Sequence, residues 1–583
     1  MDMRNATRSA LLSILVANAA ACGSDPYVGD TLVSSLSDAA PLTRTDAAVV
    51  DLRGPADAGS DTGTVGTYQV SIPPARQVDL VFMIDNSPSM APKQQKLIAQ
   101  FPRLIEGFKD PRDGSLPDLR IAIIDSDLGT GGGYSSGSCG PKTLVDGSVS
   151  NYGDLGRFQM INAKACGVTS ADSLFLEYKA GAPVNFVGDM SAVFGCLASN
   201  LGTLGCGEEH SLQAFEFALA AKGIGNEAQQ AAFLRPTAYL GLIFLTDEDD
   251  CSAATNDGMF GVRPGNADLS GESASLRCYT RSHQCSGVAL SKSGPGYPTT
   301  QAFSAPLTQC TARTDACPNP TDGVSSTGTD TSNPTSCSPL KDIKQLANHL
   351  KSIKSGPDQI LVVGIFGWPL NDSDQATAVY KIDSVPNPAA DPNHSTVFDS
   401  WPVCYDPSHK PSSSAFDTAA AGWGATAGLR NAAFVKEFGV NGLTFSICQP
   451  DFSDPMFQIG DSLAKSYEPL CIADALADVD ASTPGLQPDC RVVLSTPTVD
   501  PSDSSKLIFQ DSSPLPMCPA GSSSGAVANT CWQLTLDRTI CPGSGQLVEL
   551  LRSSSDLASG SLPAGTRLRA QCQICPTCDP ATL

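Results

Sequence analysis

The chain has 583 residues, which is enough for about two to four domains and at least one large hydrophobic core. Hydrophobic residues make up 41% of it, a share that is normal for folded proteins and excludes general disorder. The formal net charge of −23 argues against a nucleic-acid partner, because such a partner requires Lys and Arg to neutralise its phosphates.

The N-terminus has the pattern of an export signal. Arg4 and Arg8 precede the short apolar run 10–17, and small residues follow it. This order is typical of a secretory signal peptide, which we place at residues 1–21, and the run is too short to span a bilayer.

Cys22 directly follows three alanines. This resembles the lipobox of bacterial lipoproteins, in which the cysteine becomes lipidated, although Ala19 stands where leucine is more common. The resemblance implies lipidation at Cys22, and Gly23-Ser24 lack the Asp that retains lipoproteins in the inner membrane, so outer-membrane placement is preferred. The alternative is an ordinary cleaved signal with Cys22 in a disulfide.

The cysteine count supports export. There are 21 cysteines, and the 20 that remain without Cys22 allow up to ten disulfides in an oxidising compartment. Cys572, Cys575 and Cys578 are closely spaced, which is compatible with a metal or redox role. No fourth ligand lies nearby, so disulfides are favoured there too.

Composition predicts the domain organisation. Residues 22–75 are rich in Asp, Ala, Gly, Ser, Thr and Pro, which indicates a flexible tether. Nearly unbroken apolar runs then predict strands buried on both faces of a sheet. These runs are 78–84, 119–124, 239–245, 360–366 and, more weakly, 443–447.

Helical spacing of apolar residues alternates with these strands. It is found at 97–108, 343–353 and 452–467, which predicts an α/β domain at 76–470. We expect disulfide-rich insertions in this domain at about 128–206, 251–339 and 369–418. Short strands and clustered cysteines predict a small β-rich domain at 485–583.

The first strand ends in a motif with metal-ligand chemistry. Asp85-Asn86-Ser87-Pro88-Ser89 places a carboxylate and two hydroxyls on a tight turn before a helix. These are hard oxygen donors at the carboxyl end of a parallel strand, where α/β folds bind ligands, and they suit Mg²⁺, Ca²⁺ or Mn²⁺. Asp146-Gly147-Ser148-Val149-Ser150 matches the same pattern but lacks a preceding strand, so we attribute it to chance.

Together with Thr246-Asp247 at the end of the strand 239–245, this motif resembles the metal ion-dependent adhesion site (MIDAS) of von Willebrand factor A (vWA) domains. The resemblance covers roughly residues 76–468 without the insertions. It implies a vWA, Rossmann-like fold with a doubly wound, mainly parallel sheet. It also implies that Asp85, Ser87, Ser89 and Asp247 hold a divalent cation; the alternative is that Asp85 and Asp247 only cap the segments that follow them.

The chain departs from the family at two places. Cys206 stands near the position of the usual metal-site Thr, so Thr203, Glu208 and Glu209 are the alternatives for the additional ligand. Asp247 is followed by Glu248-Asp249-Asp250 instead of Gly, which we interpret as a solvated acidic loop.

No enzyme signature is evident. The five histidines form no HExxH motif, and the chain has no P-loop. We therefore expect a non-enzymatic, lipid-anchored protein of the outer membrane or cell surface. It would bind a protein or extracellular-matrix ligand through the cation and an acidic side chain of that ligand, in adhesion or assembly. The alternatives are a structural envelope scaffold with a vestigial metal site and, less favoured, an exported metal-dependent hydrolase.

Overall fold

The computed structural model describes most of the chain between residues 64 and 575. The described ranges are 64–71, 77–110, 114–129, 139–144, 147–170, 172–235, 238–253, 278–279, 281–285, 288–289, 309–317, 337–354, 359–370, 382–386, 396–409, 422–465, 470–479, 482, 486–500, 503–519, 521–538, 541, 544–558, 562 and 566–575. The signal peptide, Cys22, most of the tether and Asp146 lie outside these ranges.

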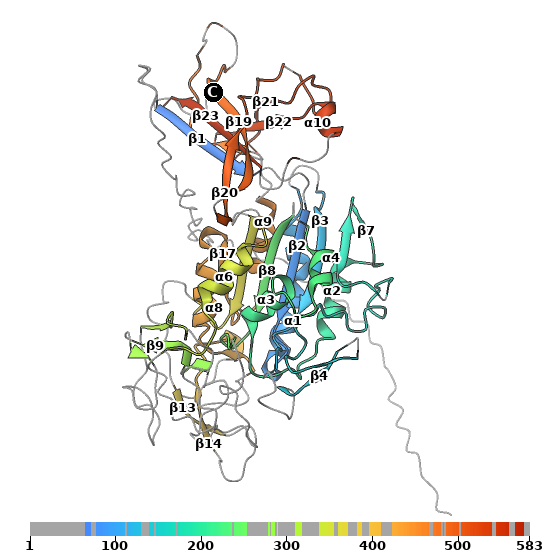
Figure 1. The fold of residues 1–583 in the computed structure, drawn as a ribbon, viewed down its shortest axis with the longest axis vertical. Coiled ribbons are helices and arrows are strands. Elements are labelled where there is room, and N and C mark those ends of the chain that lie inside the picture. The colour runs from blue at the N-terminus through green and yellow to red at the C-terminus, as the bar shows by residue number, and fades with distance from the viewer. Residues whose placement is uncertain are drawn as a thin grey trace, which may run out of the picture. The chain divides into compact units, whose positions relative to one another are not determined.

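The largest sheet has seven strands in the order β17-β12-β8-β2-β3-β6-β7. Their bounds are β2 Gln77–Ile84, β3 Asp118–Ile124, β6 Leu176–Lys179, β7 Ala182–Pro183, β8 Tyr239–Leu245, β12 Ile360–Phe366 and β17 Gly442–Ser446. The strands from β17 to β3 run parallel to their neighbours, and they match the five strands predicted from apolar runs. Strands β8, β2 and β3 lie side by side in Figure 1.

Helices cover both faces of this sheet because side chains alternate along each strand. Phe82 of β2 packs in one core cluster and Val81 in the other. The first cluster includes residues of α1 Ala91–Gly107, α2 Met190–Ser199 and α9 Ser453–Lys465. The second includes residues of α3 Ser211–Leu219, α4 Glu227–Phe233, α6 Ile343–Lys351 and α8 Leu429–Lys436. Close approach of α1 and α9 requires glycine, since a Cβ on Gly107 would lie 2.5 Å from the carbonyl oxygen of Phe457.

The predicted fold class is wrong. The vWA resemblance predicted a doubly wound, mainly parallel sheet, but the sheet is a mixed one, since β6 is antiparallel to β3 and β7 is antiparallel to β6. Several small antiparallel sheets accompany it. A parallel neighbour to β3 would require a crossover connection. The chain instead stays near the carboxyl end of β3, where the amide of Gln159 donates to the carbonyl of Ile123, so the next strand runs in the opposite direction.

The expected insertion at 128–206 is also partly wrong, because it contributes to the core. Besides β6 and β7 it contains α2, whose Phe194 stacks on Phe101 of α1 with ring centroids 3.8 Å apart. Asp189 caps this helix by accepting a hydrogen bond from the amide of Ala192. The same segment holds the short pair β4 Lys142–Thr143 and β5 Val149–Ser150.

The other two expected insertions contain small sheets. Within 251–339 lie β9 His283–Cys285, β10 Val288–Ala289 and β11 Cys310–Ala312. Within 369–418 lie β13 Ile382–Pro386, β14 Thr396–Ser400, and β15 Cys404–Tyr405, which pairs with β16 Gly424–Ala425. Short 3₁₀ helices are η1 Pro88–Met90, η5 Pro407–His409 and η6 Gly439–Asn441.

Two antiparallel sheets and the helix α10 Ser554–Ala558 form the C-terminal region. One sheet has the order β1-β23-β19-β20, with β1 Thr64–Ser71, β19 Cys490–Asp500, β20 Asp503–Asp511 and β23 Arg567–Ile574. The other has the order β18-β22-β21, with β18 Leu470–Ile472, β21 Cys531–Leu536 and β22 Gln546–Leu551. Strand β1 corrects the predicted tether, because residues 64–71 pair along their whole length with β23.

Nine disulfides join cysteines within the described residues. The pairs are Cys139–Cys206, Cys166–Cys196, Cys251–Cys278, Cys285–Cys310, Cys317–Cys337, Cys404–Cys448, Cys471–Cys541, Cys490–Cys572 and Cys518–Cys531. This number of disulfides is typical of an exported protein, as predicted. Cys572 and Cys575 are both disulfide-bonded, which disfavours a metal site in that cluster. None of the helices in the described part of the chain is both long and apolar enough to cross a membrane.

Candidate metal-binding site

Two neighbouring strands place the predicted metal ligands together. Asp85 directly follows β2, and Asp247 lies two residues after the end of β8. Because β2 and β8 are parallel neighbours, their carboxyl ends meet at the same edge of the sheet. The amide of Asp85 donates to the carbonyl of Leu245 at 3.0 Å, which fixes the two strand ends to one another.

Asp85, Ser87, Ser89 and Asp247, here called the Asp85 group, are connected by short contacts. The Ser87 amide donates to Oδ1 of Asp85 at 2.7 Å. The Ser87 and Ser89 hydroxyl oxygens are 3.2 Å apart, and Ser89 Oγ donates to Oδ1 of Asp247 at 3.1 Å. All four residues proposed from the sequence as principal ligands therefore converge on one place. Thr246, which the sequence did not single out as a site residue, donates from Oγ1 to Oδ2 of Asp85 at 2.7 Å.

Burial makes the Asp85 carboxyl difficult to ionise. Asp85 is fully buried, and the loss of hydration together with the negative charge of Asp247 raises its pKa to about 6. Hydrogen bonds from Ser87 and Thr246 act in the opposite direction by stabilising the carboxylate. A cation beside Asp85 would favour its charged form further.

Lys93 is part of this site and was missed by sequence reasoning. Its Nζ forms an ion pair with Oδ2 of Asp247 and also donates to the carbonyl of Ser89 at 3.3 Å, with only 2% of its side chain exposed. The signal that could have revealed it is its position, four residues after Ser89 on the inward face of α1. Gln94, the next residue, donates to the carbonyls of Asp85 and Gly202 at 2.9 and 3.0 Å.

Glu209 is the most poorly compensated carboxylate near the Asp85 group. It is 1% exposed, and burial raises its pKa well above the usual range, as do the charges of Asp85, Glu248 and Asp247. Among the described residues, neither of its carboxylate oxygens makes a hydrogen bond of normal geometry, although the Ser126 hydroxyl is near enough to favour the ionised form. Of the alternatives for the additional ligand, Glu209 thus interacts electrostatically with both Asp85 and Asp247.

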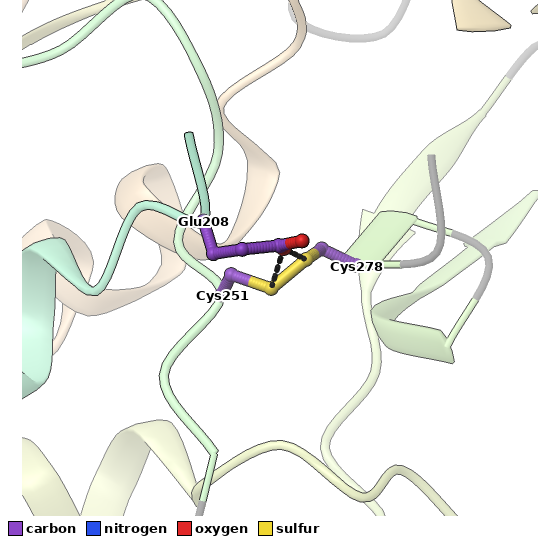
Figure 2. Close-up of side chains that lie close together, drawn as sticks. All are labelled: Glu208, Cys251 and Cys278. Atoms are coloured by element: carbon purple, nitrogen blue, oxygen red, sulfur yellow. Dashed lines mark hydrogen bonds between the residues drawn. A yellow bond between two sulfur atoms is a disulfide. The ribbon is translucent and has the colours of Figure 1, made fainter. Parts of the chain in front are cut away.

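The other two alternatives are placed differently. Oε2 of Glu208 lies 3.7 and 3.5 Å from the sulfurs of Cys251 and Cys278 (Figure 2). Although these three groups are close enough together to hold a metal ion, the two cysteines form a disulfide and offer no thiolate. Thr203 is half-buried, and its hydroxyl makes no hydrogen bond to the Asp85 group within the described residues.

Asp249 and Asp250 do not form the solvated acidic loop expected from the sequence. They are 2% and 0% exposed. Asp249 accepts hydrogen bonds from the amides of Arg430 and Asn431 in the first turn of α8, at 2.9 and 3.1 Å. Asp250 accepts one from the amide of Leu212 in the first turn of α3, at 3.0 Å. The loop is therefore structural, because its carboxylates cap two helices.

The neighbouring strand end carries further buried acidic residues. Asp125 and Asp127 follow β3, and the charges of Asp154 and Asp127 add to burial in raising the pKa of Asp125. Lys142 pairs with Asp127 at 2.5 Å and with Asp154 at 3.1 Å. This carboxyl edge of the sheet thus contains further carboxyl groups beyond the Asp85 group, and Lys142 partly compensates their charge.

Comparison with known proteins identifies no family. No family model matches the chain, and no curated protein matches it. Among solved structures it is similar to the pilus adhesin SpaC from Lactobacillus rhamnosus GG, with 11% sequence identity and a TM-score of 0.23. The match covers 89% of this chain and 42% of SpaC, so the chain spans less than half the length of that protein. A similarity at this level supports no statement about fold or function.

Proposed function

We propose that this exported protein holds a divalent cation, Mg²⁺ or alternatively Ca²⁺ or Mn²⁺, in the Asp85 group and uses it to bind a ligand. The observation that carries the proposal is the convergence of Asp85, Ser87, Ser89 and Asp247 at the ends of two adjacent parallel strands. Every donor in the group is a hard oxygen, which is the ligand type that these cations prefer.

The charges around the group support the same proposal. Asp85, Asp247 and Glu209 are buried carboxylates, and the Lys93 ammonium forms an ion pair with Asp247. Burying negative charges together without compensation is costly. A divalent cation in the Asp85 group would offset this cost.

The residues have distinct roles in this proposal. The Ser87 and Ser89 hydroxyls and the Asp85 and Asp247 carboxylates would hold the ion, while Thr246 orients the Asp85 carboxylate through its hydrogen bond. A bound ion would supply an electrophilic position for an oxygen of the ligand. The ligand would be a protein or matrix component that offers an acidic side chain, in adhesion or assembly.

The proposed cellular setting follows from the N-terminal sequence. Lipid attached to Cys22 would tether the protein to the outer membrane or cell surface, and residues 23–63 would separate the anchor from the folded region. We propose a binding protein and not an enzyme, because no nucleophile and base are paired by a known catalytic signature in the sequence.

A structural scaffold with a vestigial metal site is the second candidate. The ion pair between Lys93 and Asp247 favours it, since an internal ammonium allows the site to fold without a metal ion. In that case partner binding would be unaffected by a chelator, whereas the favoured proposal requires the cation.

Isothermal titration calorimetry tests the proposal. We expect Mg²⁺ or Ca²⁺ to bind the full chain at one site, and Asp85→Ala to abolish that binding. Asp118→Ala is the matched control, because Asp118 lies at the start of β3 and accepts a hydrogen bond from Ala180, remote from the Asp85 group. Equal binding by wild type and Asp85→Ala would refute the assignment of the site.

A further inference from the structure

Lys93 lies where it must interfere with a cation in the Asp85 group. Its ammonium contacts Oδ2 of Asp247 and the carbonyl of Ser89, while Ser89 Oγ contacts the other oxygen of the same carboxylate. A divalent ion bound by Ser89 and Asp247 would lie about 2.0–2.6 Å from their oxygens. The ammonium and the ion would then share one carboxylate at short range and repel one another.

The Lys93 ammonium cannot stay beside Asp247 when the ion binds. The side chain is 2% exposed, and helix α1 fixes its Cα one turn after Ser89. Repulsion between two cations is strong where water is excluded, because the effective dielectric constant is low. Binding of the ion therefore requires the ammonium to leave Asp247.

We propose that Lys93 is an internal competitor that a divalent cation must displace from Asp247, and that this residue sets the cation affinity of the site. The inference rests on the proposed function of the Asp85 group. In the absence of the ion, Lys93 compensates the charge of Asp247 and keeps the site folded. With the ion bound, the metal compensates the charge of Asp247 instead. The site consequently binds cations more weakly than its oxygen donors alone would allow.

Substitution of Lys93 separates its charge from the rest of the site. Lys93→Gln removes the charge but retains a hydrogen-bond donor for Asp247, whereas Lys93→Arg retains the charge. Lys96→Gln is the matched control on the same helix, since Lys96 pairs with Asp406 and not with the Asp85 group. The measurement is calorimetric titration of each full-length protein with Mg²⁺ and with Ca²⁺.

We expect Lys93→Gln to bind the cation about tenfold more tightly than wild type, because the ion no longer competes with a buried charge-assisted hydrogen bond. Lys93→Arg and Lys96→Gln should not gain affinity. In chelator, Lys93→Gln should melt at a lower temperature than wild type, and saturating cation should remove that difference. Lys93→Met serves as a second neutral variant if the glutamine does not fold.

The outcomes distinguish this inference from the function on which it rests. If wild type binds the cation and the neutral variants bind it equally or more weakly, the role of Lys93 is overturned and the cation site stands. Absence of binding in wild type and in all variants would overturn the proposed function, and the inference with it.

Discussion

Asp85 and Glu209 are both buried carboxylates at one edge of the main sheet, but their surroundings differ. Asp85 accepts hydrogen bonds from the Ser87 amide and the Thr246 hydroxyl, and these partly offset its loss of hydration. Glu209 has no comparable donors among the described residues and faces the charges of Asp85 and Asp247. We infer that Glu209 destabilises the metal-free protein and strengthens cation binding.

Glu209→Gln tests this inference directly. Glutamine has nearly the same shape without the charge, so in chelator the variant should be more stable than wild type by about 1 kcal/mol. Its cation affinity should be lower, because a negative charge beside the ion has been removed. Differential scanning calorimetry with and without cation measures both effects. A less stable variant with unchanged affinity would show that the Glu209 carboxylate is a structural group.

Sequence reasoning proposed the residues of the candidate site that belong to local patterns. Asp85, Ser87, Ser89 and Asp247 follow strands that their own apolar residues predict. Lys93 was missed because its partner, Asp247, is 154 residues away in the sequence. The acidic loop was likewise wrongly expected to be solvated. The sequence does not reveal that the carboxylates of Asp249 and Asp250 accept hydrogen bonds from amides of α8 and α3.

At the scale of elements, the loop 248–252 connects the first turns of α3 and α8. Oδ1 of Asp250 accepts from the Leu212 amide of α3, and its Oδ2 pairs with the Arg430 guanidinium of α8 at 3.0 Å. Arg430 is 1% exposed, so it has no access to water if this partner is lost. The Asp250 carboxylate therefore links the start of α3 to a buried charge of α8.

Asp250→Asn should destabilise the protein by about 3 kcal/mol, because it leaves the Arg430 charge buried without its carboxylate partner. Asp342→Asn is the control, since Asp342 caps the exposed start of α6 and asparagine is an equally good cap. Thermal unfolding followed by circular dichroism provides the comparison. Equal melting temperatures of the two variants would contradict the structural role of Asp250.

The amino end of the sheet contains a second buried charge cluster, with a predicted pH dependence. Burial lowers the pKa of Lys354 to about 8, although the charge of Asp79 opposes this shift; Arg235 pairs with Asp79 at 2.8 Å. Between pH 8 and 10.5 the unfolded chain therefore binds more protons than the folded chain, so stability rises with pH.

Lys354→Met should abolish this dependence. Wild type should gain about 2 kcal/mol relative to the variant between pH 8 and 10. Lys351→Met is the control, because Lys351 of α6 donates to the carbonyl of Glu437. Its stability should change with pH as that of wild type does. Parallel denaturant titrations at the two pH values measure the difference. If the free energy of unfolding changes equally with pH in wild type and Lys354→Met, the lowered pKa of Lys354 is contradicted.

The elements themselves were predictable only in part. Four of the five parallel strands were found because buried strands have nearly continuous apolar sequences. The fifth, β17, lies at the edge of the sheet and is mostly half-buried, so its apolar run is weaker. β6 was missed because a strand of only four residues, Leu-Glu-Tyr-Lys, has no such signal. α2 shows helical spacing at Met190, Val193, Phe194 and Leu197, but it lies among cysteines and glycines that suggested a loop.

At the scale of the whole molecule, long-range pairing defines the C-terminal region. β1 and β23 come from opposite ends of the described chain, and β23 also pairs with β19. No local pattern in the sequence indicates that residues 64–71 belong beside residues 567–574. The predicted tether extended too far for this reason.

The disulfide Cys490–Cys572 joins β19 to β23 across 82 residues. In the chain-entropy model a crosslink of this length stabilises by about 4 kcal/mol. The double variant Cys490→Ala/Cys572→Ala should therefore lose about this amount of stability in the C-terminal sheet, with cation binding at Asp85 unchanged. Native-state hydrogen exchange resolves the two regions. Unaltered protection of β19 and β23 would contradict the prediction.

The central claim, that the Asp85 group holds one divalent cation, is tested most directly by counting bound Mn²⁺ through electron paramagnetic resonance. We predict one bound ion per wild-type chain, displaced by Mg²⁺ or Ca²⁺, and none in Asp85→Ala. Wild-type protein that binds no Mn²⁺, or an Asp85→Ala variant that binds the same amount, would contradict the account.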